Sequence, residues 1–340
     1  MNKTKFNLIV GLSSGIIFVV LIILTHGWTD LIHQLSHLNL VWIILGFSLM
    51  VLYWIFESKT LHVIIASLNG KYKFTSAFKV TMMGQFFNSI TPFATGGQPA
   101  QLYGLTKEGI ETGTAGSILM IKFIIYQSTL TIYSLVLILW KTPFFTQRMS
   151  HLFYLILLGF TVNTSVIVFL IVFSSHRGLT HKFVSILSKI LIKLNIVKDI
   201  EKFKKSIDDN LEQFHEDILI IKDNKMLMLK SAIFTTLQLT AFFTIPYCIY
   251  RSFGMNAVKI SNMIAANSFV IMLTSFVPLP GAVGGAEGGF YMFFSLFFSK
   301  KNIMSAILLW RLLTFYSCII FGSFAVMNLS SSEKLLEKKN

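Results

Sequence analysis

The chain has 340 residues, of which 54% are hydrophobic and only 13% are charged. A soluble domain usually carries about 25% charged residues, so this composition excludes an ordinary soluble domain and predicts an all-α polytopic membrane protein. The formal net charge of +14 would suggest nucleic-acid binding in a soluble protein. In a membrane protein, however, Lys and Arg collect in cytoplasmic loops beside anionic lipid. We therefore expect a multi-pass protein of the cell (plasma) membrane that binds no nucleic acid directly.

The first half of the chain, residues 1–175, is dominated by apolar segments. They lie at roughly 6–26, 40–56, 76–93, 116–140 and 152–174. The loop at 27–39 contains no Lys or Arg, whereas lysines precede the first segment and follow the second. Because basic loops stay on the cytoplasmic side, we predict a cytoplasmic N-terminus and a cytoplasmic loop at 57–75.

The topology of this half predicts a re-entrant hairpin at 76–106. Three apolar segments separate the loop at 57–75 from the basic region 176–225, and both should be cytoplasmic. Three full crossings cannot return the chain to the same side, but two crossings and a hairpin can. Pro and Gly suit the turn of such a hairpin because they interrupt helices. The predicted turn residues are Pro92, Gly96 and Gly97.

Residues 176–225 form the one sizeable polar region. Its apolar residues recur at helical spacing, first among Lys and Arg and, from Asp199, among acidic residues. This pattern is typical of amphipathic helices at an interface. We predict a cytoplasmic amphipathic connector between two membrane halves, and a regulatory or partner-binding role is the alternative.

The second half, 226–328, contains apolar segments at 230–250, 260–279, 287–298 and 302–327, followed by a lysine-rich cytoplasmic tail at 329–340. These segments fit four crossings or two crossings around a second hairpin at 260–298. A short repeat favours the hairpin: S-x-x-P followed by a Gly pair occurs at 89–97 and at 275–285. Coincidence is the alternative for so short a match. The predicted turn residues are Pro278, Pro280, Gly281, Gly284 and Gly285.

Because the two hairpins would be entered from opposite sides, the pattern predicts an inverted repeat with broken helices that meet near the midplane. The expected architecture is about six full spans plus two re-entrant hairpins in two inverted pseudo-repeats, with up to eight helices crossing.

Charged residues inside the apolar segments mark the candidate site. Glu287, Arg311 and Lys122 are costly at membrane depth and are therefore functional or paired. The alternative for Glu287 is a structural ion pair with Arg311 or Lys122. Glu57 follows the second apolar segment and is explained by an interfacial position. Neutral polar candidates are Gln98, Gln101 and Gln127. No motif predicts a catalytic residue, a metal site or a cofactor.

Four stretches of the sequence resemble a known family: ITPFATGGQPAQLYGLTKEGI, SILMIKFIIYQ, FVPLPGAVGGAEGGFY and LLWRLLTFY. They are similar to the lysylphosphatidylglycerol synthase transmembrane, or flippase-like, family, which includes the N-terminal membrane domain of the multiple peptide resistance factor. The resemblance extends from about residue 6 to 327. The first motif departs from the commonest form, which has an acidic residue and an arginine where this chain has Gln98 and Gln101.

The resemblance implies a lipid translocase that moves lysylphosphatidylglycerol or another polar lipid, including lipid-linked sugars, between leaflets. In that reading Arg311 and Lys122 face phosphate and Glu287 faces a cation. The alternatives are a membrane component of phosphatidylglycerol lysyltransferase, linked to lysyl-lipid synthesis and cationic peptide resistance, and a scaffold for a separate soluble transferase. We expect no aminoacyl transfer by this chain alone, because the family's soluble synthase domain has no counterpart here. A homo-oligomer is left open.

Overall fold

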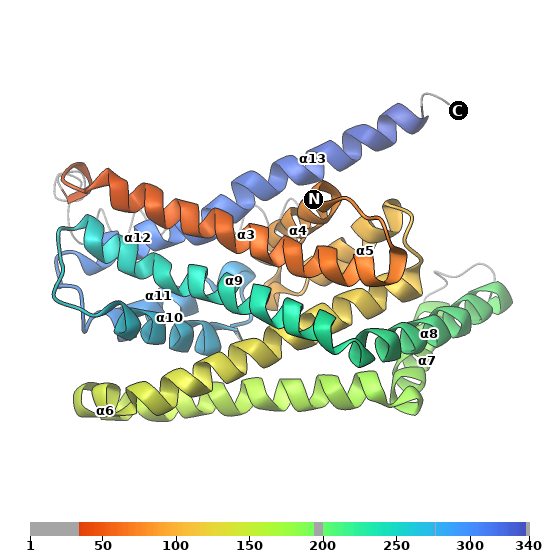
Figure 1. Ribbon diagram of the computed structural model, residues 1–340, viewed down its shortest axis with the longest axis horizontal. Helices are drawn as coiled ribbons and strands as arrows, with labels where there is room; N and C mark the ends of the chain where they lie inside the picture. Colours follow the sequence, from red (N-terminus) through yellow and green to blue (C-terminus); the bar gives the residue numbers. More distant parts are fainter. Residues whose placement is uncertain (1–33, 194–199, 276, 338–340) are drawn as a thin grey trace.

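The computed structural model describes residues 34–193, 200–275 and 277–337, and within them the chain is helical with no strand (Figure 1). The all-α fold is therefore confirmed. Within these described residues, five helical segments are long and apolar enough to cross a membrane: Leu40–Leu68, Thr112–Arg148, Tyr154–Ser175, Lys225–Ser252 and Ile303–Met327. The predicted segment 6–26 lies outside the described residues.

Helix α3 (Leu40–Asn69) extends well beyond the apolar segment that predicted it. The side chain of Asn39 accepts a hydrogen bond from the backbone N–H of Val41 and begins the helix, and Gly70 ends it with a φ of 67°. Most of the predicted loop at 57–75 is therefore helix, and that expectation is wrong. Polar residues from Glu57 onward lowered the hydropathy without interrupting the helix.

Helix α6 (Thr112–Ser175) contains two of the five candidate spans. Figure 1 shows its two arms, yellow and green, running in opposite directions on one side of the molecule. The predicted segments 116–140 and 152–174 each fall within one arm. Helix α9 (Lys225–Ser252) packs along the length of α3.

The last span consists of α12 (Ile303–Arg311), a π-helical turn at Leu312–Tyr316 and α13 (Ser317–Glu337). It packs against α4 (Phe74–Ile90) at Gly322, where an added Cβ would lie only 2.8 Å from the carbonyl oxygen of Met82. Small residues at such crossings let membrane helices approach closely. The buried core beside this span is rich in aromatic rings, among them Phe290, Phe294 and Trp310.

Two helical hairpins occupy the middle of the chain's two halves. In the first, α4 is followed by a short turn η1 (Pro92–Ala94) and returns as α5 (Gly97–Lys107). In the second, α10 (Ile260–Thr274) is followed by η2 (Pro280–Ala282) and returns as α11 (Gly285–Phe294). In each hairpin the two helices pack against each other, and η1 packs directly on η2. The depth of the hairpins in a membrane stays a prediction.

The two turns begin with the same backbone conformation, and they differ only at the residues that lead into the returning helices. An extended residue, Thr91 or Leu279, precedes a proline, and the next two residues have positive φ in both turns. The structure thus pairs Pro92 with Pro280, so that P-x-A-x-G-G occurs at 92–97 and at 280–285. The register predicted from S-x-x-P, which paired Pro92 with Pro278, is wrong, although the predicted repeat of turns is present.

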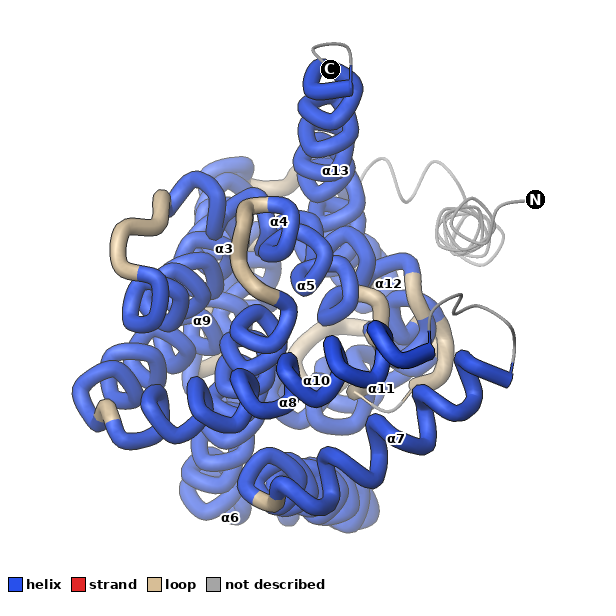
Figure 2. Tube along the Cα trace, turned by 90° about the vertical axis from the view of Figure 1, so that its right-hand side faces the viewer, coloured by secondary structure: helices blue, strands red, loops and turns tan. Residues whose placement is uncertain are grey.

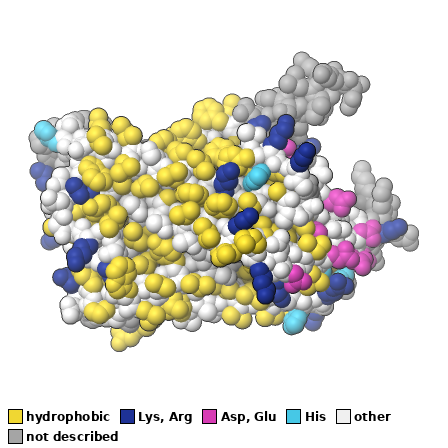
Figure 3. All heavy atoms as spheres, viewed as in Figure 1, with side chains coloured by type: hydrophobic (Ala, Val, Ile, Leu, Met, Phe, Trp, Pro, Cys, Tyr) yellow, Lys and Arg dark blue, Asp and Glu magenta, His cyan; other side chains and the backbone are white. Residues whose placement is uncertain are grey.

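The polar connector forms α7 (Arg177–Lys193) and α8 (Ile200–Asp223). Figure 2 shows both helices at one end of the bundle, and Figure 3 shows acidic side chains gathered at the same end. Helix α8 is fixed to the start of α6 because the side chain of Asn210 accepts a hydrogen bond of 2.8 Å from the backbone N–H of Gly113. Its cytoplasmic position stays a prediction.

Candidate functional site

Arg311 and Glu287 form a buried ion pair beside the second turn. The Nε of Arg311 lies 2.7 Å from Oε1 of Glu287, and the side chain of Arg311 is only 6% exposed. A second nitrogen, Nη1, donates to the carbonyl oxygen of Gly281 at 3.0 Å. Arg311 therefore ties the last span to both the turn and the returning helix of the second hairpin.

Glu287 also caps the helix on which it stands. It is the third residue of α11, and its Oε2 accepts a 2.7 Å hydrogen bond from the backbone N–H of Gly284, which has a φ of 81°. A carboxylate in the first turn is favourable because helix N-termini carry partial positive charge. Both oxygens of Glu287 thus have partners, one of which is Arg311, as the structural alternative predicted.

Gly281 must be glycine for two reasons. Its φ of 61° lies in the left-handed region. An added Cβ would also lie only 2.1 Å from Cε2 of Phe315, whose ring is seated on the turn. The close packing places Phe315 beside the guanidinium of Arg311, with 5.1 Å between the guanidinium carbon and the ring centroid.

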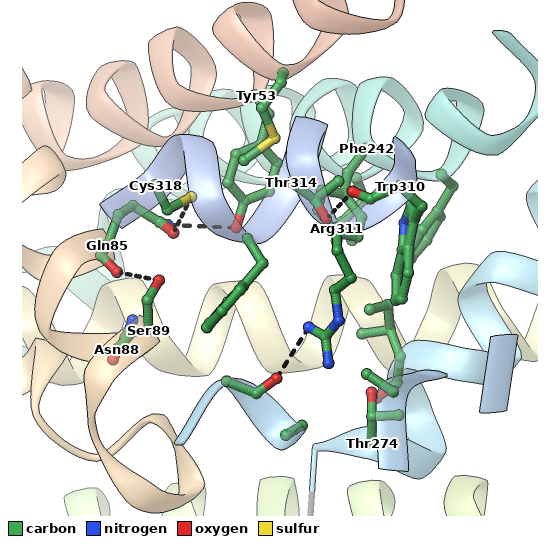
Figure 4. Close-up of a pocket in the computed structure, with 18 of the residues that line it drawn as sticks. Tyr53, Gln85, Asn88, Ser89, Phe242, Thr274, Trp310, Arg311, Thr314 and Cys318 are labelled. Atoms are coloured by element: carbon green, nitrogen blue, oxygen red, sulfur yellow. Dashed lines mark hydrogen bonds between the residues drawn. The ribbon is translucent and has the colours of Figure 1, made fainter. Parts of the chain in front are cut away.

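The third nitrogen of the guanidinium has no partner. Nη2 of Arg311 is buried and makes no hydrogen bond to any part of the chain that the structure describes. Arg311 lines a cavity of about 230 Å³ together with Ser89, Asn88 and Thr274. Figure 4 shows Arg311 extending toward the η2 turn, across this cavity from Ser89 and Asn88 of α4. A buried, unsatisfied donor on a charged group is costly unless a ligand or water satisfies it.

A second buried ion pair lies beside the first turn. Nζ of Lys122, on α6, lies 2.8 Å from Oε1 of Glu57, on α3, and also donates to Oε1 of Gln101 at 3.2 Å. The other oxygen of Glu57 accepts from Nε2 of Gln85, on α4, at 2.5 Å. This pair therefore holds α3, α6 and the first hairpin together.

Glu57 is the residue that sequence reasoning misplaced. It is 7% exposed, sits inside a helix and is paired with Lys122, so an interfacial position alone does not account for it. Lys122 pairs with Glu57 and not with Glu287, so of the two pairings considered for Glu287 only the one with Arg311 is present. The sequence did contain one indication that Glu57 lies in a helix. No Gly or Pro separates it from the second apolar segment, so the helix could continue through it.

The three predicted glutamines line one cavity beside the first hairpin. Gln98 and Gln101 line a cavity of about 560 Å³ together with Lys122 and Glu57. Gln127 lines it too, but its Nε2 is held at 2.5 Å by Oδ1 of Asn163 on the second arm of α6.

Of the predicted turn residues, Pro92 and Pro280 begin the two short turns, and the four glycines of the Gly pairs cap and begin the returning helices. Pro278 lies outside the turn.

The two cavities share one wall. Tyr53, Gln85, Asn88 and Tyr126 line both of them. Lys122 lines one and Arg311 lines the other, and these cations follow the paired prolines Pro92 and Pro280 at nearly the same distance along the chain. The arrangement thus brings together two pseudo-equivalent turns, each with its own cation and hydrogen-bonding side chains.

The geometry defines a class of protein: a polytopic helical membrane protein with paired broken hairpins and polar cavities between them. No group of three or more His, Cys, Asp or Glu side chains suited to a metal occurs within the described ranges.

A family model described as the lysylphosphatidylglycerol synthase TM region matches residues 8–322, and the chain belongs to this family. It is 27% identical over 300 residues to a UPF0104 membrane protein of Archaeoglobus fulgidus, with 85% of this chain and 86% of that protein covered. A UPF0104 membrane protein of Methanocaldococcus jannaschii is 27% identical over 319 residues, with 92% of this chain and 91% of that protein covered.

Proposed function

We propose that this protein is a lipid translocase, which moves a polar phospholipid between the two leaflets of the cell membrane. The observation that carries the proposal is the contact between the two pseudo-equivalent turns, with polar cavities on a shared wall beside them. Broken helices at membrane depth are tolerated where they line a cavity, and their ends can bind a polar group. A headgroup could therefore leave water and cross beside these turns while its acyl chains stay in lipid.

Family membership supports a role in the handling of polar lipid, because the family is described by a synthase of lysylphosphatidylglycerol. The exposed apolar surface also supports it. Large apolar side chains such as Leu40, Leu139 and Phe169 face outward along the spans, as expected where acyl chains surround the protein.

The test is lipid movement in reconstituted vesicles. The purified protein is inserted into liposomes that contain several phospholipids, and the rate at which each inner-leaflet headgroup reaches an external, impermeant reagent is followed. Glu287→Gln should slow this movement because it weakens the ion pair that positions Arg311. Glu216→Gln, which changes an exposed carboxylate on α8, is the matched control and should leave the rate unchanged.

No accelerated movement of any phospholipid by folded wild-type protein would overturn the proposal. Equal rates in wild type and Glu287→Gln would place the path away from the second hairpin.

The second candidate is a membrane component of a phosphatidylglycerol lysyltransferase, which the description of the family favours. Lipid extracts separate the two functions. If expression of this chain in a host without lysyl lipids produces lysylphosphatidylglycerol, the translocase proposal alone is insufficient.

A further inference from the structure

The charges around the two cavities indicate which kind of lipid headgroup the site would bind. Two carboxylates belong to the site, Glu57 and Glu287, and each already faces a cation of the chain. Both oxygens of each also accept hydrogen bonds from within the protein. Glu57 is the only acidic residue that lines either cavity in the part of the chain that the structure describes. The site therefore offers no unneutralised carboxylate to an ammonium group.

Hydrogen-bond donors, in contrast, are in surplus. Nη2 of Arg311 is buried without a partner in the described part of the chain, and Arg311 lines the smaller cavity. Lys122 has three N–H donors, of which two are used by Glu57 and Gln101. Asn88, which lines both cavities, uses its Oδ1 to accept from the backbone N–H of Gly97 at 2.9 Å, and its Nδ2 can donate two further hydrogen bonds.

The helix ends strengthen the same preference. Helices α5 and α11 begin at the two turns, and residues of their first turns, Gly97 and Ala286, line the larger and the smaller cavity respectively. These N-termini carry partial positive charge, which Glu287 already offsets in part at α11, and the N–H of Gly97 at α5 is bound by Asn88. At the opposing C-terminus of α4, hydroxyls cover backbone carbonyls: Ser89 donates to the carbonyl oxygen of Gln85, and Thr91 to that of Phe87.

From this imbalance we propose that the cavities bind an anionic, acceptor-rich headgroup without an ammonium, of which phosphatidylglycerol is the simplest. Its phosphate oxygens accept from Nη2 of Arg311, and its glycerol hydroxyls face Asn88 and the shared wall. The inference rests on the proposed translocase function and narrows its substrate. It opposes the expectation that Glu287 faces a cation, and it places a lysylated headgroup among the poorer substrates.

The experiment compares lipids in one vesicle preparation that contains phosphatidylglycerol, lysylphosphatidylglycerol and phosphatidylethanolamine. External periodate cleaves the vicinal diol of accessible phosphatidylglycerol, and an impermeant amine reagent modifies the other two lipids. Protein-free vesicles give the background rates. We expect phosphatidylglycerol to reach the outer leaflet at least about tenfold faster than lysylphosphatidylglycerol, because the lysyl group adds two ammonium groups that the cations of a partly buried site repel.

A second test changes the charge of the shared wall and leaves Arg311 in place. Asn88→Asp keeps the oxygen that accepts from the N–H of Gly97 and adds a negative charge to the shared wall. It should lower the ratio of phosphatidylglycerol to lysylphosphatidylglycerol movement at least about tenfold. Arg251→Gln, which removes a cation that stacks on Trp42 away from both cavities, is the matched control and should leave the ratio unchanged.

Faster movement of lysylphosphatidylglycerol by wild type, or an unchanged ratio in folded Asn88→Asp, would overturn the assigned headgroup class while the translocase function stands. No movement of any of the three lipids would overturn the translocase function itself, and the headgroup inference with it. If Asn88→Asp does not fold, the rate of lipid movement is measured with Arg311→Lys instead. It keeps a cation for Glu287 but lacks the free Nη2 that the phosphate binds, so it should slow the movement of phosphatidylglycerol, and an unchanged rate in folded protein would overturn the inference.

Discussion

The two hairpins share a turn but differ in how their cations are held. In the second hairpin, the carboxylate partner of Arg311 stands on the returning helix of the hairpin itself. In the first, the partner of Lys122 comes from α3, outside the hairpin. The first turn also places Phe93 at the left-handed position where the second has Gly281. The two hairpins therefore have a similar backbone turn, although the carboxylates of their ion pairs come from different elements.

The difference has a mechanical consequence. The second ion pair fixes one hairpin to the last span, so movement of that hairpin requires the pair to separate or to move with it. The first pair fixes two spans to each other and reaches the hairpin through the neutral side chains of Gln85 and Gln101. A hydrogen bond with one ionised partner is weaker than an ion pair whose two partners both carry charge. We therefore expect the first hairpin to move more easily than the second.

The largest expected effect follows from removal of Arg311. Arg311→Ala leaves the partly buried Glu287 without its cation and should destabilise the protein by up to about 3 kcal/mol. The midpoint of thermal unfolding in detergent measures the loss. Restoration of stability by Arg311→Ala combined with Glu287→Ala, relative to Arg311→Ala alone, would show that the unpaired carboxylate causes it. Equal stability of single and double variants would contradict the ion-pair account.

Gly281→Ala tests the second turn. The left-handed φ and the contact with Phe315 should together cost about 1–3 kcal/mol and displace the carbonyl oxygen that Arg311 binds. Thermal unfolding again measures the cost. Gly288→Ala is the control, since an added Cβ there meets nothing within 4 Å and φ is not in the left-handed region.

Phe93→Gly makes the first turn like the second and should have the opposite sign. Phe93 is 52% exposed and has a φ of 53°, so glycine relieves backbone strain with little loss of packing. We expect unchanged stability or a gain of up to about 1 kcal/mol. A clear loss, measured in the same unfolding assay, would show that the exposed ring has contacts that matter more than the strain.

The smallest expected effect is that of pH on the free energy of unfolding. It should arise in the polar connector and not in either hairpin. Burial and the nearby Arg177 and His181 lower the pKa of His215 on α8, whose Nε2 lies 2.8 Å from the hydroxyl of Thr180. The unfolded chain then binds more protons below its ordinary pKa of about 6.5. Stability is therefore full above that pH and falls as the pH drops toward the lowered pKa. His215→Gln should flatten this part of the stability curve, while a steeper curve would contradict the assignment.

The sequence by itself determined the membrane class, the helical fold and the existence of the two turns. Composition excludes a soluble fold, and uninterrupted apolar segments leave helices as the way to satisfy backbone hydrogen bonds in lipid. Pro and Gly at membrane depth indicate broken helices, so Pro92 and Pro280 could be predicted as turn residues. The charges of Glu287 and Arg311 could be singled out because isolated charges are rare in such segments.

Only the tertiary structure decided which charges pair and where the repeat is in register. Glu57 and Lys122 are far apart in sequence, and no local pattern states that α3 and α6 bring them within 2.8 Å. Hydropathy placed Glu57 at an interface because the average hydropathy falls at this residue. A fall in hydropathy does not mark the end of a helix. The correct register of the turns depends on backbone dihedral angles, which the letters of S-x-x-P do not encode. The free Nη2 of Arg311 is likewise visible only once every neighbouring acceptor has its place.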